Sequence, residues 1–167
     1  MIHLDDQDVP KIEDDDFIED EGGPHAKQTP DRVHIDYFIR SVQLFEVTGE
    51  ILSRHYSIKA KHSETAKSET HCAEALASWL QSCETYMRWR PSAHRFWPAL
   101  LSMHYYTNLL LLHRIHVPKR NAAAEGVRIS DEMMDSIATA HHAAAMITSI
   151  IEKLIEQDEL RFTPAFV

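Results

Sequence analysis

The sequence contains little glycine, proline or cysteine, and these shortages exclude whole classes of structure. Its 167 residues include 4 glycines, 7 prolines and 2 cysteines. So few glycines leave little material for tight hairpin turns, and the composition therefore favours helices. Cys72 and Cys83 are too few for a four-thiolate zinc site, a six-cysteine zinc cluster or a disulfide framework. We expect both thiols to be buried, in a protein of a reducing compartment.

Positive charge is scarce as well, because the formal net charge is −9. Residues 1–21 hold ten acids and one base, which leaves 16 residues of each sign in 22–167. We expect residues 1–31 to form an acidic extended arm that docks a few apolar side chains onto the rest of the chain. A disordered activation segment is the alternative reading of the same composition. Neither part offers a basic face, so we expect no direct contact with nucleic acid.

Apolar periodicity predicts an all-α fold, an irregular bundle of about four helices within a domain at 32–167. The first helix is expected at about 32–56, and a shorter one at about 69–84 after a polar loop. The first helix has one apolar stripe, made of Phe38, Val42, Phe45, Gly49, Leu52 and Tyr56. Because Gly49 lowers helix propensity, we expect another helix to approach closely there.

The most apolar stretch begins at Leu100 and reads LLSMHYYTNLLLLHRIHVP. It belongs to a helix expected at about 93–117, with Pro98 in the first turn, where a missing N–H does no harm. Apolar residues cover almost its whole circumference, which is typical of a central bundle helix or of a membrane span. The longest unbroken apolar run, at 109–112, is far shorter than the about 20 residues that a span needs. We therefore predict a buried central helix and no membrane contact.

A last long helix is predicted after Ser130, which is a good N-cap. Its apolar residues repeat at four-three spacing: Met133, Ile137, Ala140, Ala144, Ile147, Ile151 and Leu154. The small residues in the middle of this seam favour close packing against the leucine-rich helix. The chain ends in the apolar run LRFTPAFV, from which we expect a helical domain that is incomplete at its C-terminal end. Exposed apolar helix faces would then favour self-association.

The sequence has 12 histidines, yet their spacing does not predict a metal site. It has no HExxH, HxxxH or ExxH motif, and the adjacent His141 and His142 would point about 100° apart on a helix. It also lacks a nucleophile elbow and a glycine-rich phosphate loop. We predict a protein that is not an enzyme, with no catalytic residue, metal ligand or cofactor. A small helical metal-dependent enzyme is a remaining alternative, suggested by the histidine count alone.

Three blocks together are similar to one protein family. They are HIDYFIRSVQLFEVTGEIL (34–52), ALLSMHYYTNLLLLHRIHVP (99–118) and AAAMITSIIEKLIEQDELRFTPAFV (143–167). The sequence resembles the middle homology (xylanolytic activator-type regulatory) region of fungal zinc-cluster transcription factors, especially the branch of cutinase transcription factor beta. The resemblance covers about residues 5–167, including the acidic DDQDVP and DDDFIED. It departs at Ile115, where many members have proline, and the zinc-cluster DNA-binding module of the family is absent from this chain.

The resemblance implies a non-catalytic regulatory module of a fungal RNA polymerase II transcription factor in the nucleus. Zinc is expected only in the missing upstream module, and the partners are other parts of the same factor or transcriptional co-regulators. The most specific block supplies the candidate structural or regulatory positions, His104, Tyr105, Tyr106, Asn108, His113 and Arg114. We expect hydrogen-bonding roles for them within a buried helix. An alternative function is the binding of a fatty acid or another metabolite, since polar groups among large apolar ones line small-molecule pockets.

Overall fold

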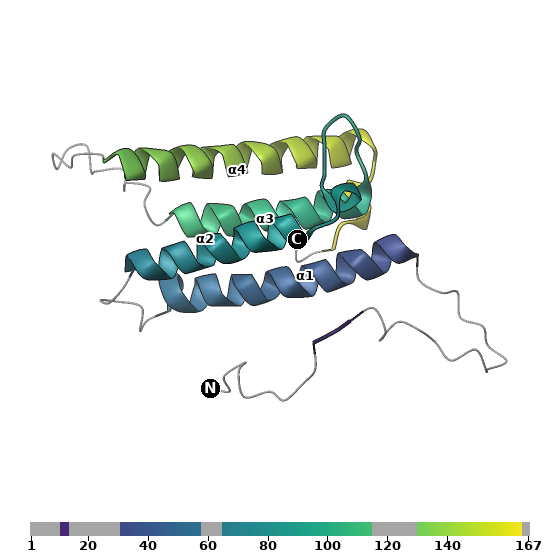
Figure 1. The fold of residues 1–167 in the computed structure, drawn as a ribbon. Coiled ribbons are helices and arrows are strands. Elements are labelled where there is room, and N and C mark those ends of the chain that lie inside the picture. The colour runs from purple at the N-terminus through teal and green to yellow at the C-terminus, as the bar shows by residue number, and fades with distance from the viewer. Residues whose placement is uncertain (1–10, 14–30, 58–64, 115–129, 165–167) are drawn as a thin grey trace.

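The chain forms a bundle of four α-helices in the computed structural model (Figure 1). The structure describes residues 11–13, 31–57, 65–114 and 130–164. The helices are α1 (Arg32–Ile51), which continues as the short π-helix η3 (Leu52–Tyr56), α2 (Thr65–Ser82), α3 (Phe96–Arg114) and α4 (Asp131–Glu156). Two 3-10 turns follow α2 and α4, namely η5 (Thr85–Met87) and η6 (Leu160–Phe162). No strand occurs in these described ranges, which confirms the all-α prediction.

The helix α3 lies at the centre of the bundle, between α4 and the pair formed by α1 and α2 (Figure 1). Its buried residues are Pro98, Ala99, Leu100, Leu101, Met103, His104, Asn108 and Leu112. The predicted central helix is therefore confirmed, with Pro98 in its first turn. Within the described ranges, no helix combines the length and the apolar character that crossing a membrane requires.

Two apolar clusters fill the bundle on opposite sides of α3. The first joins α1, α2 and α3 through Leu44, Ile51, Cys72, Leu76, Trp79, Cys83, Met87, Leu101 and Leu112. The second joins α3 and α4 and includes Trp89, Leu100, Ile150 and Leu154. Both cysteines are buried free thiols, as predicted, and burial raises the pKa of each. The thiolate form is thus disfavoured, and neither thiol is a good nucleophile.

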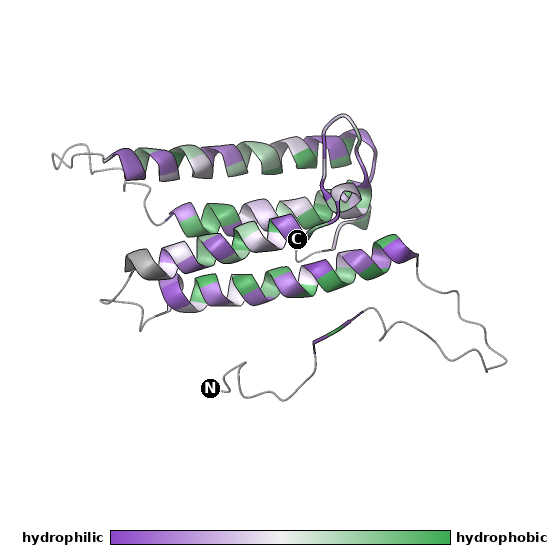
Figure 2. Cartoon of the chain, in the orientation of Figure 1, coloured by the Kyte–Doolittle hydropathy of each residue, from purple (hydrophilic) through white to green (hydrophobic). Residues whose placement is uncertain are grey.

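The first helix buries a different face from the predicted one. Four members of the predicted stripe are the half-exposed residues Phe38 (46%), Phe45 (46%), Leu52 (45%) and Tyr56 (42%). The core instead receives Leu44 and Ile51, which are fully buried, together with the partly buried Tyr37. The helix has two apolar stripes about one residue apart, and periodicity alone does not say which of them meets the core. In Figure 2, hydrophobic segments recur along the visible side of α1.

The predicted close approach at Gly49 is also wrong. Apart from its neighbours in α1, no atom of the described residues would lie within 4 Å of a Cβ atom at Gly49. The glycine therefore lowers the stability of α1 without allowing any tighter packing inside this bundle.

Two other predicted boundaries shift by a few residues. The second helix begins at Thr65 and ends at Ser82, instead of about 69 and 84. Arg88 caps this end, because its guanidinium donates hydrogen bonds to carbonyls in and directly after the last turn of α2. The acceptors are the oxygens of Leu80 (2.8 Å), Gln81 (3.3 Å) and Cys83 (3.2 Å). The helix α3 ends at Arg114, and Ile115 lies outside the described residues.

The predicted start of α4 is confirmed, because the Ser130 hydroxyl accepts a hydrogen bond from the Met133 amide at 3.3 Å. Its predicted seam is correct at Ala140, Ile147 and Leu154 but wrong at Ala144. Ala144 is exposed, whereas its neighbour Ala143 is fully buried. The true seam is Ala140, Ala143, Ile147, Ile150 and Leu154, which is the same four-three repeat in another order. Its partner is α3, as predicted.

Candidate functional site

The candidate residues of α3 do not form one site, because they point toward three different helices. The His104 ring meets Phe45 of α1, with centroids 5.1 Å apart. The Tyr105 ring stacks on Trp79 of α2, and the Tyr106 ring meets His142 of α4 edge-on. Consecutive side chains on a helix point about 100° apart, so this divergence follows from their adjacency.

The last two candidates lie at the end of the same helix. His113 Nδ1 is 3.4 Å from Ser136 Oγ of α4, and Arg114 is exposed. A positive side chain in a last helical turn interacts favourably with the helix dipole. Arg114 thus helps to stabilise the end of α3, and His113 contributes a contact with α4. Tyr105 and Tyr106 are also packing residues, and burial raises the pKa of both phenols.

His104 and Asn108 lie one turn apart on the buried side of α3. The Asn108 side-chain amide donates a hydrogen bond to the His104 carbonyl at 3.0 Å. Among the residues that the structure describes, His104 Nε2 and Asn108 Oδ1 are buried without a hydrogen-bond partner. Such an atom typically destabilises a fold by about 1–3 kcal/mol. Burial lowers the pKa of His104, so its imidazole is neutral.

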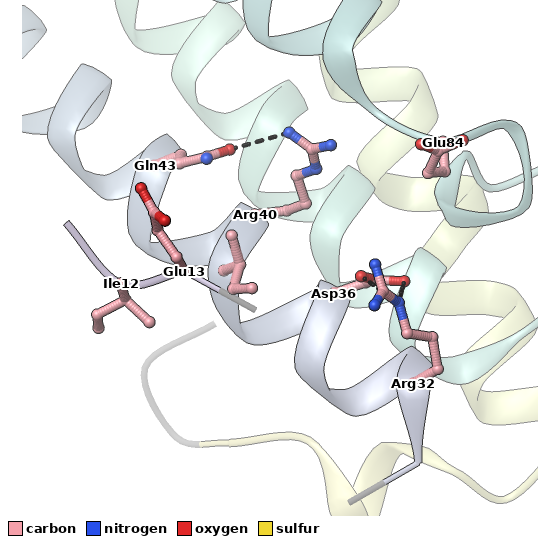
Figure 3. Close-up of a pocket in the computed structure, with 8 residues that line it drawn as sticks. Ile12, Glu13, Arg32, Asp36, Arg40, Gln43 and Glu84 are labelled. Atoms are coloured by element: carbon pink, nitrogen blue, oxygen red, sulfur yellow. Dashed lines mark hydrogen bonds and ion pairs between the residues drawn. The ribbon is translucent and has the colours of Figure 1, made fainter. Parts of the chain in front are cut away.

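A groove of about 340 Å³ lies between α1, the turn that follows α2 and the short described piece of the arm (Figure 3). Its lining residues are Ile12, Glu13, Arg32, Asp36, Ile39, Arg40, Gln43 and Glu84. The Asp36 carboxylate is buried, pairs with Arg32 Nε at 3.1 Å and accepts a hydrogen bond from the Tyr86 hydroxyl. Charges of both signs line the groove and largely neutralise each other, so it does not select a strongly charged ligand.

The arm reaches this groove at its described residues 11–13. Lys11 Nζ lies 4.0 Å from Glu46 Oε2 of α1, and Ile12 lines the groove. Phe17 and Ile18, the other apolar residues of the acidic segment at 12–20, lie outside the described residues. That residues 1–31 form an extended arm docked onto the helical domain therefore stays a prediction.

A second polar constellation joins the turn before α3 to the residues after α4. Trp89 Nε1 donates to His94 Nδ1 at 2.9 Å, and His94 Nε2 lies 2.7 Å from Glu159 Oε2. Nδ1 accepts the hydrogen bond from the tryptophan N–H, so it carries no proton itself. In the neutral imidazole the proton is therefore on Nε2, whose N–H donates a hydrogen bond to the Glu159 carboxylate. The three side chains form a clamp that closes one end of the bundle.

None of these arrangements provides a reactive centre. In the parts of the chain that the structure covers, no three His, Cys, Asp or Glu side chains gather closely enough to hold a metal ion. In the described part of the chain His113 Nδ1 lies 3.4 Å from Ser136 Oγ, which is longer than the about 2.6–3.2 Å between an activated nucleophile and its base.

The chain is similar over almost its whole length to known fungal regulators. It is 45% identical over 168 residues to cutinase transcription factor 1 alpha of Fusarium vanettenii, a match that covers 99% of this chain and 18% of that protein. It is 30% identical over 161 residues to the acetamidase regulatory protein of Aspergillus fumigatus, which covers 96% of this chain and 19% of that protein.

The chain thus matches a region of fungal transcription regulators. The resemblance to a fungal transcription factor that the sequence suggested is thus confirmed, here through a cutinase transcription factor 1 alpha. This transcription-regulator region spans less than a fifth of the length of these two relatives. No family model and no solved structure matches it.

Buried His104 should make this transcription-regulator region less stable in mild acid. A histidine in an unfolded chain has a pKa of about 6.5, and burial lowers the pKa of His104 in the folded chain. Between these two pKa values the unfolded chain binds more protons, so the free energy of unfolding falls as the pH drops below about 6.5. Replacing His104 with leucine should remove this fall in the free energy of unfolding. Urea unfolding at about pH 7.5 and about pH 5.5 measures the difference.

His141, which is exposed on α4, provides the matched control. His141→Leu should keep the full pH dependence of the unmodified chain, because it leaves His104 and its buried surroundings unchanged. An unchanged pH dependence in the His104→Leu variant would show that this buried ring does not cause the acid sensitivity.

Proposed function

We propose that this region is a non-catalytic regulatory module that corresponds to the middle homology region of a fungal transcription factor. It acts in the nucleus through contacts with other parts of the same factor or with co-regulators. The main support is the 45% identity to a cutinase transcription factor across 99% of the chain. The scattered orientation of the candidate residues on α3 adds to it, since it favours a packing role for that block.

The groove beside α1 does not favour the alternative of a fatty-acid site. Only Ile12 and Ile39 among its lining residues are apolar, and the others are polar or charged. A fatty-acid chain needs a continuous apolar wall, with polar groups confined to one end.

The test is a reporter assay in a fungal host. The chain is fused between a heterologous DNA-binding domain and an activation domain, and transcription is compared with that from the same fusion without the chain. We expect the chain to change reporter output several-fold, because a regulatory module alters the activity of the domains attached to it.

Neighbouring positions in α2 supply matched variants. Leu76 is buried and Ala77 is exposed. Leu76→Asp should unfold the bundle, since an unpaired buried carboxylate is very costly, and should abolish the regulatory effect. Ala77→Asp should retain it. Equal output with and without the chain, at equal fusion levels, would refute the proposal.

A further inference from the structure

The polar pair of α3, His104 and Asn108, keeps two buried atoms whose hydrogen-bonding capacity the described residues do not use. His104 is 8% exposed and Asn108 is 3% exposed. Within the described ranges, no side chain or backbone group bonds to His104 Nε2 or to Asn108 Oδ1. Buried polar side-chain atoms in folded proteins nearly always bond to protein or to ordered water. The pair therefore points to a bound molecule that supplies both bonds.

The spacing of the two side chains fits a single bridging atom. The Asn108 amide nitrogen Nδ2 donates to the His104 carbonyl at 3.0 Å, and this bond leaves Oδ1 as the free end of the side chain. Residues four apart on one helix have Cβ atoms about 5–6 Å apart. Two hydrogen bonds in sequence, each about 2.7–3.0 Å long, span that distance, and one does not. One small molecule between the side chains thus reaches both.

The chemistry of the two atoms selects a neutral ligand that can donate. Asn108 Oδ1 is an acceptor only, so the ligand has to donate a hydrogen bond to it. The His104 imidazole is neutral, because burial lowers its pKa, and Nε2 donates or accepts according to the tautomer. Most other buried residues of α3 are apolar, so an ion would lose its hydration there without compensation. Water meets these requirements, since it is small, neutral and both a donor and an acceptor.

We propose that one buried water molecule bridges His104 Nε2 and Asn108 Oδ1 within the bundle. It donates a hydrogen bond to the asparagine oxygen and makes a second one with the imidazole. Structural waters of this kind have two to four polar partners and occur about once per 27 residues. The bridge satisfies both polar side chains inside an otherwise apolar core. This inference is independent of the proposed function.

Oxygen-17 magnetic relaxation dispersion of the solvent, which counts long-lived internal waters, tests the proposal. Asn108→Leu and His104→Leu should each lower the count by one water molecule per chain, because each removes one end of the bridge. Thr107→Leu is the matched control. Thr107 is exposed on the same helix, and its hydroxyl also donates to the carbonyl four residues earlier, that of Met103, at 2.8 Å. This control should keep the count of the unmodified chain, and an unchanged count in Asn108→Leu would overturn the proposal.

Urea unfolding of the double variant tests whether the two side chains share the same water. Each single variant leaves one buried polar atom without its bridge, whereas the double variant His104→Leu/Asn108→Leu leaves none. The double variant should therefore be at least about tenfold more stable, as an unfolding equilibrium constant, than the product of the two single effects. Effects that simply multiply would contradict a shared water.

A third measurement needs no substitution and decides the case if Asn108→Leu does not fold. In the unmodified chain, nuclear Overhauser spectra should show a contact between water and the Asn108 side-chain amide protons, with the sign of a long-lived complex. The absence of this contact would overturn the proposal.

Discussion

Replacing Trp79 with alanine should lower the free energy of unfolding by about 3–5 kcal/mol, as is typical of a large buried ring. Trp79 is buried between α1, α2 and α3, and its ring stacks on Tyr105 with centroids 5.7 Å apart. Its indole Nε1 also donates to the Arg40 carbonyl of α1 at 3.0 Å. The substitution therefore removes contacts to both neighbouring helices, and urea unfolding followed by circular dichroism measures the loss.

Two further variants separate the causes. Trp79→Phe keeps a ring against Tyr105 but has no N–H donor, so it should destabilise the fold less, by about 1–2 kcal/mol. Phe162→Ala removes an exposed ring after α4 and should change the stability by less than about 0.5 kcal/mol. A loss in Trp79→Ala no larger than that in Phe162→Ala would mean that Trp79 does not lie in the core.

Enlarging Ala143 to leucine should destabilise the chain by about 1–3 kcal/mol, whereas the same change at Ala144 should have little effect. Ala143 is fully buried where α4 meets α3, so additional methyl groups there force the two helices apart. Ala144 is exposed. Thermal and urea unfolding of both variants, in parallel, give the comparison.

This pair also decides the register of the seam. The sequence repeat places Ala144 against α3, and the structure places Ala143 there. If Ala144→Leu were the more damaging substitution, Ala144 and not Ala143 would lie on the face of α4 that packs against α3.

The sequence predicts the central position of α3 well because apolar residues lie on nearly every side of that helix. It predicts the faces of α1 and α4 less well because each helix has two apolar rows about one residue apart. Tyr37, Leu44 and Ile51 reach the core, and Phe45 and Leu52 do not, although both sets repeat every seven residues. Which row is buried depends on where the other helices lie, and periodicity within one helix does not contain that information.

The polar contacts of the groove and the clamp show the same limit. Arg32 and Asp36 are four residues apart on one helix, so this ion pair has a sequence signal. Tyr86 joins it from 50 residues away, and Glu159 meets His94 from 65 residues away, without any motif that links them. Only the packing of α3 between its neighbours brings these side chains together.

The clamp of Trp89, His94 and Glu159 also bears on the order of events at the ribosome. Trp89 and His94 leave the ribosome long before Glu159 has been synthesised. The nascent chain then has two of the three side chains of the clamp and lacks the third. The α1–α2–α3 unit can begin to assemble during translation, since domains tend to fold from the N-terminus. Closure of the end that the clamp secures has to wait until α4 has been translated in full.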